Sequence, residues 1–183
     1  MRTLRTLSLV VFALTLMTFT SCDKIKSIAD VKFEAEMSAD IDATSASETL
    51  KATGLYAFSG SEVIDPTEDD DINEYWDMIK EWNIQKIIVT IKSIDEPAQL
   101  DHASLLLKDD NTGAELYSVE VHNLALQNGT KILEVTEADW TKLVNTLNSK
   151  HKIYAAIEGS IDKPSVHIIF RVKIYTKVTA NPL

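Results

Sequence analysis

The sequence predicts a mainly β protein, an antiparallel β-sandwich of about eight strands with two short helices. Apolar and polar residues alternate over several long stretches, turn-forming residues separate these stretches at hairpin spacing, and two short segments have helical periodicity. Each such strand has one apolar face that must be buried, and a second sheet is the simplest cover for it. An open sheet covered on one side by the two helices is the main alternative.

The first half of the chain contributes three predicted strands and a helix. Residues 31–41 alternate throughout, and residues 49–60, after the turn-rich TSASE segment, are interpreted as their hairpin partner, with Gly54 marking a bulge. Residues 69–82 are predicted to be a helix, because apolar and aromatic residues recur at i, i+3, i+4 and i+7 behind an acidic amino-terminal end. Residues 83–94 are rich in β-branched residues and predict the next strand.

Turn-forming residues define the strands that follow. Residues 102–108 and 114–124 flank the DDNTG segment, which predicts a hairpin turn with Gly113 in the left-handed position. The QNGT segment predicts a second turn, of the Asn-Gly type, leading into a strand at 131–135.

The last third contains the second helix and two strands. Thr136 and Asp139 form an approximate capping arrangement for a helix with one apolar stripe. That stripe consists of Trp140, Leu143, Val144 and Leu147. Strands are predicted at 152–160 and 166–178, joined by a turn around Pro164.

The first 21 residues have the organisation of a secretory signal peptide. Arg2 and Arg5 form a short basic region, and an uncharged apolar run follows from Leu7 to Phe19. This run is too short to cross a bilayer as a stable helix, but it fits the apolar region of a signal. A buried first helix is the competing interpretation, and it would need a polar face that this run lacks.

The segment FTSC, which ends at Cys22, resembles the lipobox of bacterial lipoproteins, in which an aliphatic and two small residues precede the cysteine that receives lipid. Thr20, Ser21 and Cys22 fit the pattern, whereas Phe19 replaces the usual leucine. The resemblance implies cleavage before Cys22, a diacylglycerol thioether on its sulfur and an acyl chain on its new amino terminus. Such a set of acyl chains suffices for stable membrane anchoring.

The mature chain left by this cleavage has 162 residues, which suits one domain that buries about 70% of the surface of its unfolded chain. We expect a signal peptide at 1–21, a lipidated tether at 22–30 and a single β-sandwich domain at 31–183. Loss of Arg2 and Arg5 leaves 16 basic against 28 acidic residues, a formal charge of −12. Such a surface repels nucleic acid and bare anionic headgroups, so neither is an expected partner.

An acidic run ahead of the first predicted helix is one candidate ligand site. Acidic and amide side chains alternate from Asp69 to Asn73 like the first ligands of a calcium loop, but Glu74 and Lys80 break the pattern at its sixth and twelfth positions. A non-standard calcium site would use Asp65, Glu68, Asp69 and Asp71. The competing interpretation is a solvated helix amino terminus stabilised by the helix dipole.

Aromatic side chains provide another candidate. Trp82 is the tryptophan that we expect to be exposed. Together with Tyr75 it would form a platform on which the face of a sugar stacks. Trp76 and Trp140 lie on the inward stripes of the predicted helices and are assigned to the core.

The histidines at 102, 122, 151 and 167 are dispersed, and none has the spacing of a zinc-ligand pair on a helix. The Asp101-His102 pair would support a hydrolase only beside a nucleophile in a recognisable elbow, and the serine stretches FSGSE and EGSID lack that pattern. We therefore expect no metal, no cofactor and no enzyme activity. A hydrolase with an unfamiliar site would need a cleft where a histidine meets a carboxylate and a hydroxyl.

Together these features predict a lipid-anchored binding or interaction module of a bacterial envelope, attached to membrane lipid through Cys22. One alternative is an accessory lipoprotein that captures a glycan or peptide for an outer-membrane uptake system. Another is a structural subunit of an envelope or fimbria-like assembly, joined through its long first and last strands. Asp23 resembles an inner-membrane retention signal of some bacterial lineages but not of others, and we expect the outer membrane, on either its periplasmic or its surface face.

Overall fold

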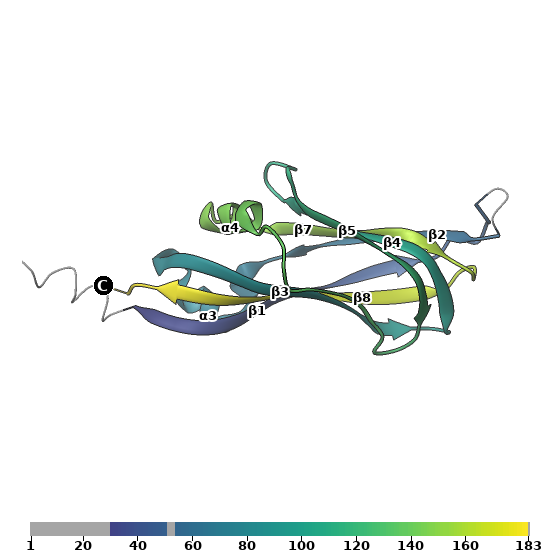
Figure 1. Ribbon diagram of the computed structural model, residues 1–183, viewed down its shortest axis with the longest axis horizontal. Coiled ribbons are helices and arrows are strands. Elements are labelled where there is room, and N and C mark those ends of the chain that lie inside the picture. Colours follow the sequence, from purple (N-terminus) through teal and green to yellow (C-terminus); the bar gives the residue numbers. More distant parts are fainter. Residues whose placement is uncertain (1–29, 51–53, 183) are drawn as a thin grey trace, which may run out of the picture.

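Two four-stranded antiparallel sheets pack face to face in the computed structural model, which describes residues 30–50 and 54–182 (Figure 1). The strands are β1 (Val31–Thr44), β2 (Tyr56–Ile64), β3 (Ile79–Ile94), β4 (Ala98–Asp109), β5 (Glu115–Leu126), β6 (Lys131–Val135), β7 (Ile153–Ile161) and β8 (His167–Ala180). The helices are α3 (Asp70–Tyr75) and α4 (Thr141–Asn148), with the 3-10 turns η1 (Pro66–Glu68) and η2 (Trp76–Met78) on either side of α3. The first sheet has the order β1-β8-β3-β6 and the second β2-β7-β4-β5, which confirms the predicted sandwich.

The core lies between the two sheets and is built from the inward-facing residues, which alternate with outward-facing residues along each strand. Every second residue from Val166 to Val178 is at most 1% exposed, as the alternation in this segment predicts. Phe170 in this row stacks on Phe58 of the facing sheet, with ring centroids 5.4 Å apart. The open-sheet alternative is therefore wrong, because a sheet covers the apolar face of β8.

The pairing of the first two strands differs from the prediction. β1 pairs with β8, whereas β2 pairs with β7 in the other sheet, so residues 49–60 are not the hairpin partner of residues 31–41. Gly54 has a φ of +71° and precedes β2, so it lies in the connection rather than at a bulge. Alternation determines which face of a strand is buried but not which strand lies beside it, so a hairpin and a crossover have the same pattern.

Both predicted helices are present but shorter than their periodic segments. Asp69 caps α3, because its carboxylate accepts a hydrogen bond from the Ile72 N–H at 3.0 Å, and β3 already begins at Ile79. The second helix begins at Thr141, so Thr136 is not its cap. Asp139 does accept a hydrogen bond from the Thr141 N–H, at 3.0 Å.

The last strand is not at the edge of its sheet. β8 lies between β1 and β3, and the edge strands are β1 and β6 in the first sheet and β2 and β5 in the second. The last strand therefore cannot pair with a second copy of the chain, because both edges of β8 are already hydrogen-bonded, one to β1 and one to β3. That part of the structural-subunit prediction is wrong.

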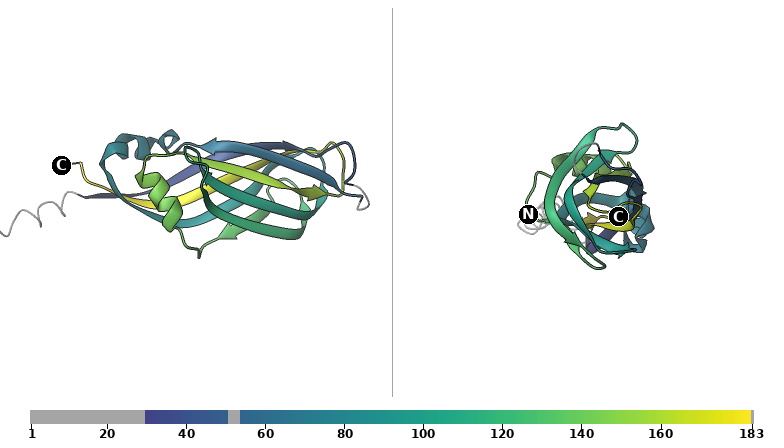
Figure 2. Two further views of the ribbon diagram at one scale, coloured as in Figure 1. Left: turned by 90° about the horizontal axis from the view of Figure 1, so that it is seen from above. Right: turned by 90° about the vertical axis from the view of Figure 1, so that its right-hand side faces the viewer.

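The sandwich is elongated, and β1 runs along it from one end to the other (Figure 2). At one end Val31 pairs with Ala180, so β1 begins where β8 finishes. At the opposite end the Ser45 N–H donates to the carbonyl oxygen of Val166 at 2.9 Å. Fourteen residues of extended chain at about 3.3 Å each separate these ends by about 45 Å. Within the described residues, no helix is long and apolar enough to cross a membrane.

Candidate functional site

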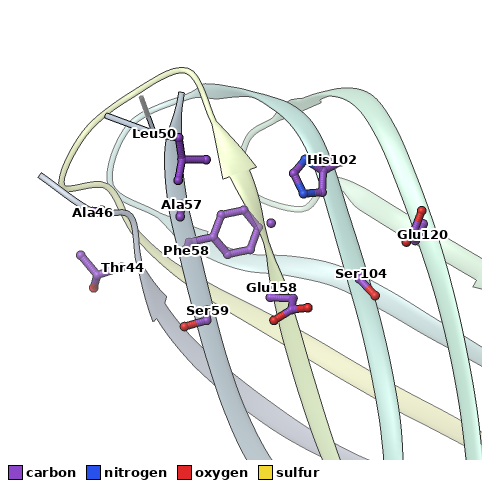
Figure 3. Close-up of a pocket in the computed structure, with 11 residues that line it drawn as sticks. Thr44, Ala46, Leu50, Ala57, Phe58, Ser59, His102, Ser104, Glu120 and Glu158 are labelled. Carbon is purple, nitrogen blue, oxygen red and sulfur yellow. The ribbon is translucent and has the colours of Figure 1, made fainter. Parts of the chain in front are cut away.

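The candidate site is a hollow of about 610 Å³ on the outer face of the second sheet, at the end of the sandwich away from Val31 (Figure 3). All four strands of that sheet contribute to it, together with Thr44 at the end of β1 and the segment that follows. The sheet supplies the polar lining, and the side chains of Leu50 and Ala57 supply an apolar patch at one side.

Strand register aligns residues of the hollow, together with Ser160 and His122 beside it, in two rows across the sheet. The first row consists of Ser59, Glu158, Ser104 and Glu120. The second consists of Ala57, Ser160, His102 and His122. Side chains alternate along a strand, so both rows are on the outer face, while the intervening Phe58 and Ala103 point into the core. These residues come from four separated segments, and the sequence contains no local motif that unites them.

An irregularity in β4 places two consecutive polar side chains on the outer side of the sheet, and one of them, His102, lines the hollow. The register between β4 and β7 shifts between Leu100 and His102, so Asp101 and His102 are both on the outer side while Leu100 and Ala103 are buried. A β-bulge of this kind re-aims side chains and is frequent near functional sites. The Asp101-His102 pair is visible in the sequence, but the bulge that presents it is not.

A hydrogen-bonded cluster supports the ring of His102 at the base of the second row. The Nδ1 atom of His102 lies 3.0 Å from the Oδ2 atom of Asp101 and 3.0 Å from the Oγ atom of Ser160. The Ser160 hydroxyl is also 3.3 Å from the same carboxylate oxygen. The hydrogen bond from His102, aided by Ser160, lowers the pKa of Asp101 below its usual value.

This cluster contains the three groups that a hydrolase would need, but not in the required order. A nucleophilic serine must face substrate and share its proton with a base whose other nitrogen is held by the carboxylate. Here the carboxylate and the hydroxyl meet the same ring nitrogen, and Ser160 is fully buried. The arrangement positions His102 and leaves Ser160 unable to reach a substrate in the hollow.

The acidic groups of the hollow are not neutralised by lysine or arginine. The residues that line it include Glu120 and Glu158 and no lysine or arginine. Glu120 lies 3.7 Å from the Nε2 atom of His122, and Glu158 has no ion pair within the part of the chain that the structure describes. The hollow therefore presents two glutamate side chains to a ligand with no lysine or arginine of the protein beside them in its lining.

The outer face of the first sheet has the opposite character. All four acidic side chains of β1 contact a basic side chain of β8, and Arg171 binds Asp40 through two nitrogens at 2.7 and 2.9 Å. The Arg171 guanidinium, with a contribution from Lys92, lowers the pKa of Asp40 to about 2. The carboxylates of β1 are therefore paired with the protein's own basic side chains.

The predicted calcium ligands have other roles. Asp65 accepts hydrogen bonds from the N–H and hydroxyl of Thr67 at 2.9 and 2.7 Å and pairs with Lys152 at 2.7 Å. Asp69 caps α3 and also accepts the Glu36 N–H at 3.2 Å. Glu68 and Asp71 lie in η1 and the first turn of α3. No three histidine, cysteine, aspartate or glutamate side chains gather to hold a metal among the described residues, so the structure gives this hypothesis no support.

The predicted aromatic platform is wrong. Trp82 is 4% exposed and meets Trp76 edge to face, with ring centroids 6.2 Å apart. Tyr75 packs against Phe33 at 5.6 Å. The error arises because β3 begins at Ile79, so Trp82 follows the alternation of a strand and points inward. Trp76 and Trp140, which were assigned to the core, pack against it while partly exposed.

A second polar cluster, which was not predicted from the sequence, joins the turn after β4 to α4. One oxygen of Asp109 accepts the N–H groups of Asn111 and Thr112 at 2.9 and 2.8 Å. The other accepts the Thr146 hydroxyl at 3.1 Å and lies 2.9 Å from Nδ1 of His151. Burial alone would raise the pKa of Asp109, but these hydrogen bonds, that of His151 first, hold it well below its usual value. Asp109 is the first residue of the DDNTG turn, and an aspartate at the start of a turn is the feature of the sequence that could have predicted this role.

We expect Asp109→Asn to lower the free energy of unfolding at pH 7 by about 2 kcal/mol, because it weakens several hydrogen bonds around a residue that is 6% exposed. The folded-state pKa is depressed, so the carboxylate contributes fully above the unfolded value of 3.8 and less as the pH falls below it. The difference between wild type and variant should therefore shrink from pH 7 to pH 3. Urea denaturation at both values measures it, and a constant difference would contradict this account.

Comparisons with known proteins give weak structural similarity at very low sequence identity. No protein-family model matches the chain, and no curated protein is significantly similar to it. Among solved structures, the decameric capsid protein of BFDV matches with a TM-score of 0.46 and 6% identity over 81% of this chain and 99% of that chain. The structure of Desmodium yellow mottle tymovirus matches with a TM-score of 0.35 and 10% identity over 84% and 90%.

Proposed function

We propose that this chain is an exported, lipid-anchored binding module of a bacterial envelope, with its binding surface at the end of the sandwich away from the membrane. The observation that supports this proposal most strongly is that the first described strand begins at one end of the domain, whereas the hollow lies at the other end. β1 begins at Val31, immediately after the expected tether, and its other end, Thr44, lines the acidic hollow.

The proposed geometry follows from the length of β1. Cys22 and the tether up to residue 29 lie outside the described residues, so lipidation rests on the FTSC segment and on the single cysteine of the sequence. With lipid on Cys22, the end of the domain that holds Val31 faces the bilayer, and the hollow stands about 45 Å farther out. A site at that distance is clear of the lipid headgroups and open to a partner in the periplasm or at the cell surface.

The capture of a ligand for an outer-membrane uptake system is a more specific form of this function. In that form the hollow, and not Trp82 and Tyr75, is the ligand surface, because Trp82 is buried. We place the protein in the outer membrane, as in those bacterial lineages in which an aspartate after the lipidated cysteine does not retain the protein in the inner membrane.

We expect Cys22→Ala to abolish acyl labelling and to move the protein out of the membrane fraction, because no acyl chain then holds it. Cells are grown with a radiolabelled fatty acid, and labelling and fractionation are compared for wild type and variant. Ser21→Ala is the matched control, since it keeps a small residue before the cysteine and should retain the label. Labelling that persists in Cys22→Ala would overturn the proposed anchor.

A further inference from the structure

The two outer faces of the sandwich differ in how their charges are balanced. On the first sheet the acidic row of β1 is matched by the basic row of β8. On the second sheet, Glu120 and Glu158 face the hollow without a lysine or arginine in its lining. The glutamates of the hollow are therefore open to a positively charged partner, whereas the acidic row of β1 is already paired with β8.

The two glutamates have a spacing that suits one cationic group. Glu158 and Glu120 are both register partners of Ser104, one on each side of it. Their strands are separated by β4 alone, so their backbones are about 10 Å apart. The short Ser104 side chain leaves room between them, where a guanidinium can donate to a carboxylate on each side.

The rest of the hollow suits the remainder of a peptide. Leu50 and Ala57 provide apolar surface for the aliphatic stem of an arginine or lysine. Ser59 and Ser104 are small, so an extended backbone can approach the sheet closely and hydrogen-bond to their hydroxyls. The formal charge of −12 expected for the mature chain also raises the association rate of a basic partner.

We propose that this hollow docks an extended, basic segment of a partner protein, with an arginine or lysine side chain between Glu120 and Glu158. The proposal rests on the binding function proposed above and names its partner class. It is independent of the anchor, because the hollow consists of residues of the folded domain alone.

The test is fluorescence anisotropy with a fluorescein-labelled Gly-Arg-Gly-Arg-Gly-Arg-Gly peptide and the full chain purified in a mild non-ionic detergent. We expect Glu120→Gln/Glu158→Gln to raise the Kd at least tenfold. Asp71→Asn/Glu81→Gln removes the same charge from exposed residues of α3 and β3 and should change the Kd less than twofold. Circular dichroism verifies that both double variants are folded.

Three results would overturn the proposal. One is an equal loss of binding in both double variants, which would mean that only net charge attracts the peptide. Another is the absence of peptide binding to the wild type at millimolar concentration. The third is spermine competing as tightly as the peptide, which would assign the hollow to a small polyamine. Each leaves the acyl-labelling result at Cys22 unchanged, so failure here is distinguishable from failure of the proposed function.

Discussion

Phe170→Ala should lower the free energy of unfolding by about 4 kcal/mol, the largest loss expected for a truncation in this core. Phe170 has no exposed surface and stacks on Phe58 across the two sheets. Its removal leaves a cavity between rigid ladders that cannot collapse to fill it, so the lost transfer free energy and the cavity cost add. For a domain stabilised by roughly 5–15 kcal/mol, this is a large fraction of the total.

Urea denaturation followed by tryptophan fluorescence measures this effect. Ile169→Ala is the matched control, because Ile169 is the neighbouring residue of β8, points outward and is partly exposed. We expect it to cost about 1 kcal/mol or less, since less apolar surface is lost from the protein interior. Equal losses for the two variants would show that the core is not where the alternation of β8 places it.

The fold class was predictable from the sequence because alternation reports burial directly. β8 illustrates this, since its inward row is buried from Val166 to Val178. The sheet order was not predictable, because pairing depends on contacts between segments far apart in the chain. The clearest case is β2, which was expected to form a hairpin with β1 but pairs with β7.

The candidate site was less predictable than the fold for the same physical reason. Asp101 and His102 are adjacent in the sequence, but Glu120, Glu158 and Ser160 join them only through strand register. The prediction of an exposed aromatic platform was wrong for Trp82. The residues around Trp82 fit both the spacing of a helix and the alternation of a strand. A local pattern could not decide between the two, because the outcome depends on the pairing of Trp82 with Val178.

Gly159→Ala should lower the free energy of unfolding by about 3 kcal/mol, because there is no space for a Cβ atom at this position. A Cβ atom built on Gly159 would lie 2.2 Å from the carbonyl oxygen of His102 and 2.9 Å from the Cα atom of Ala103. Both atoms belong to the backbone of β4, at the bulge that presents His102 to the hollow. Relief of the clash must therefore move the β4 backbone, at a cost in ladder hydrogen bonds between β4 and β7.

Gly129→Ala is the matched control for the Gly159 variant. Gly129 has a φ of +80° with open space around its Cα atom, so the alanine there suffers only the backbone penalty, about 1 kcal/mol. Urea denaturation of the two variants separates steric exclusion from backbone strain. If Gly159→Ala is no more costly than Gly129→Ala, β4 is not held against β7 at this bulge. In that case Gly159→Ala should also leave the affinity of the hollow for the arginine peptide unchanged. If Gly159→Ala instead displaces the bulge, the row that contains Ser104 should move and the affinity for the peptide should fall.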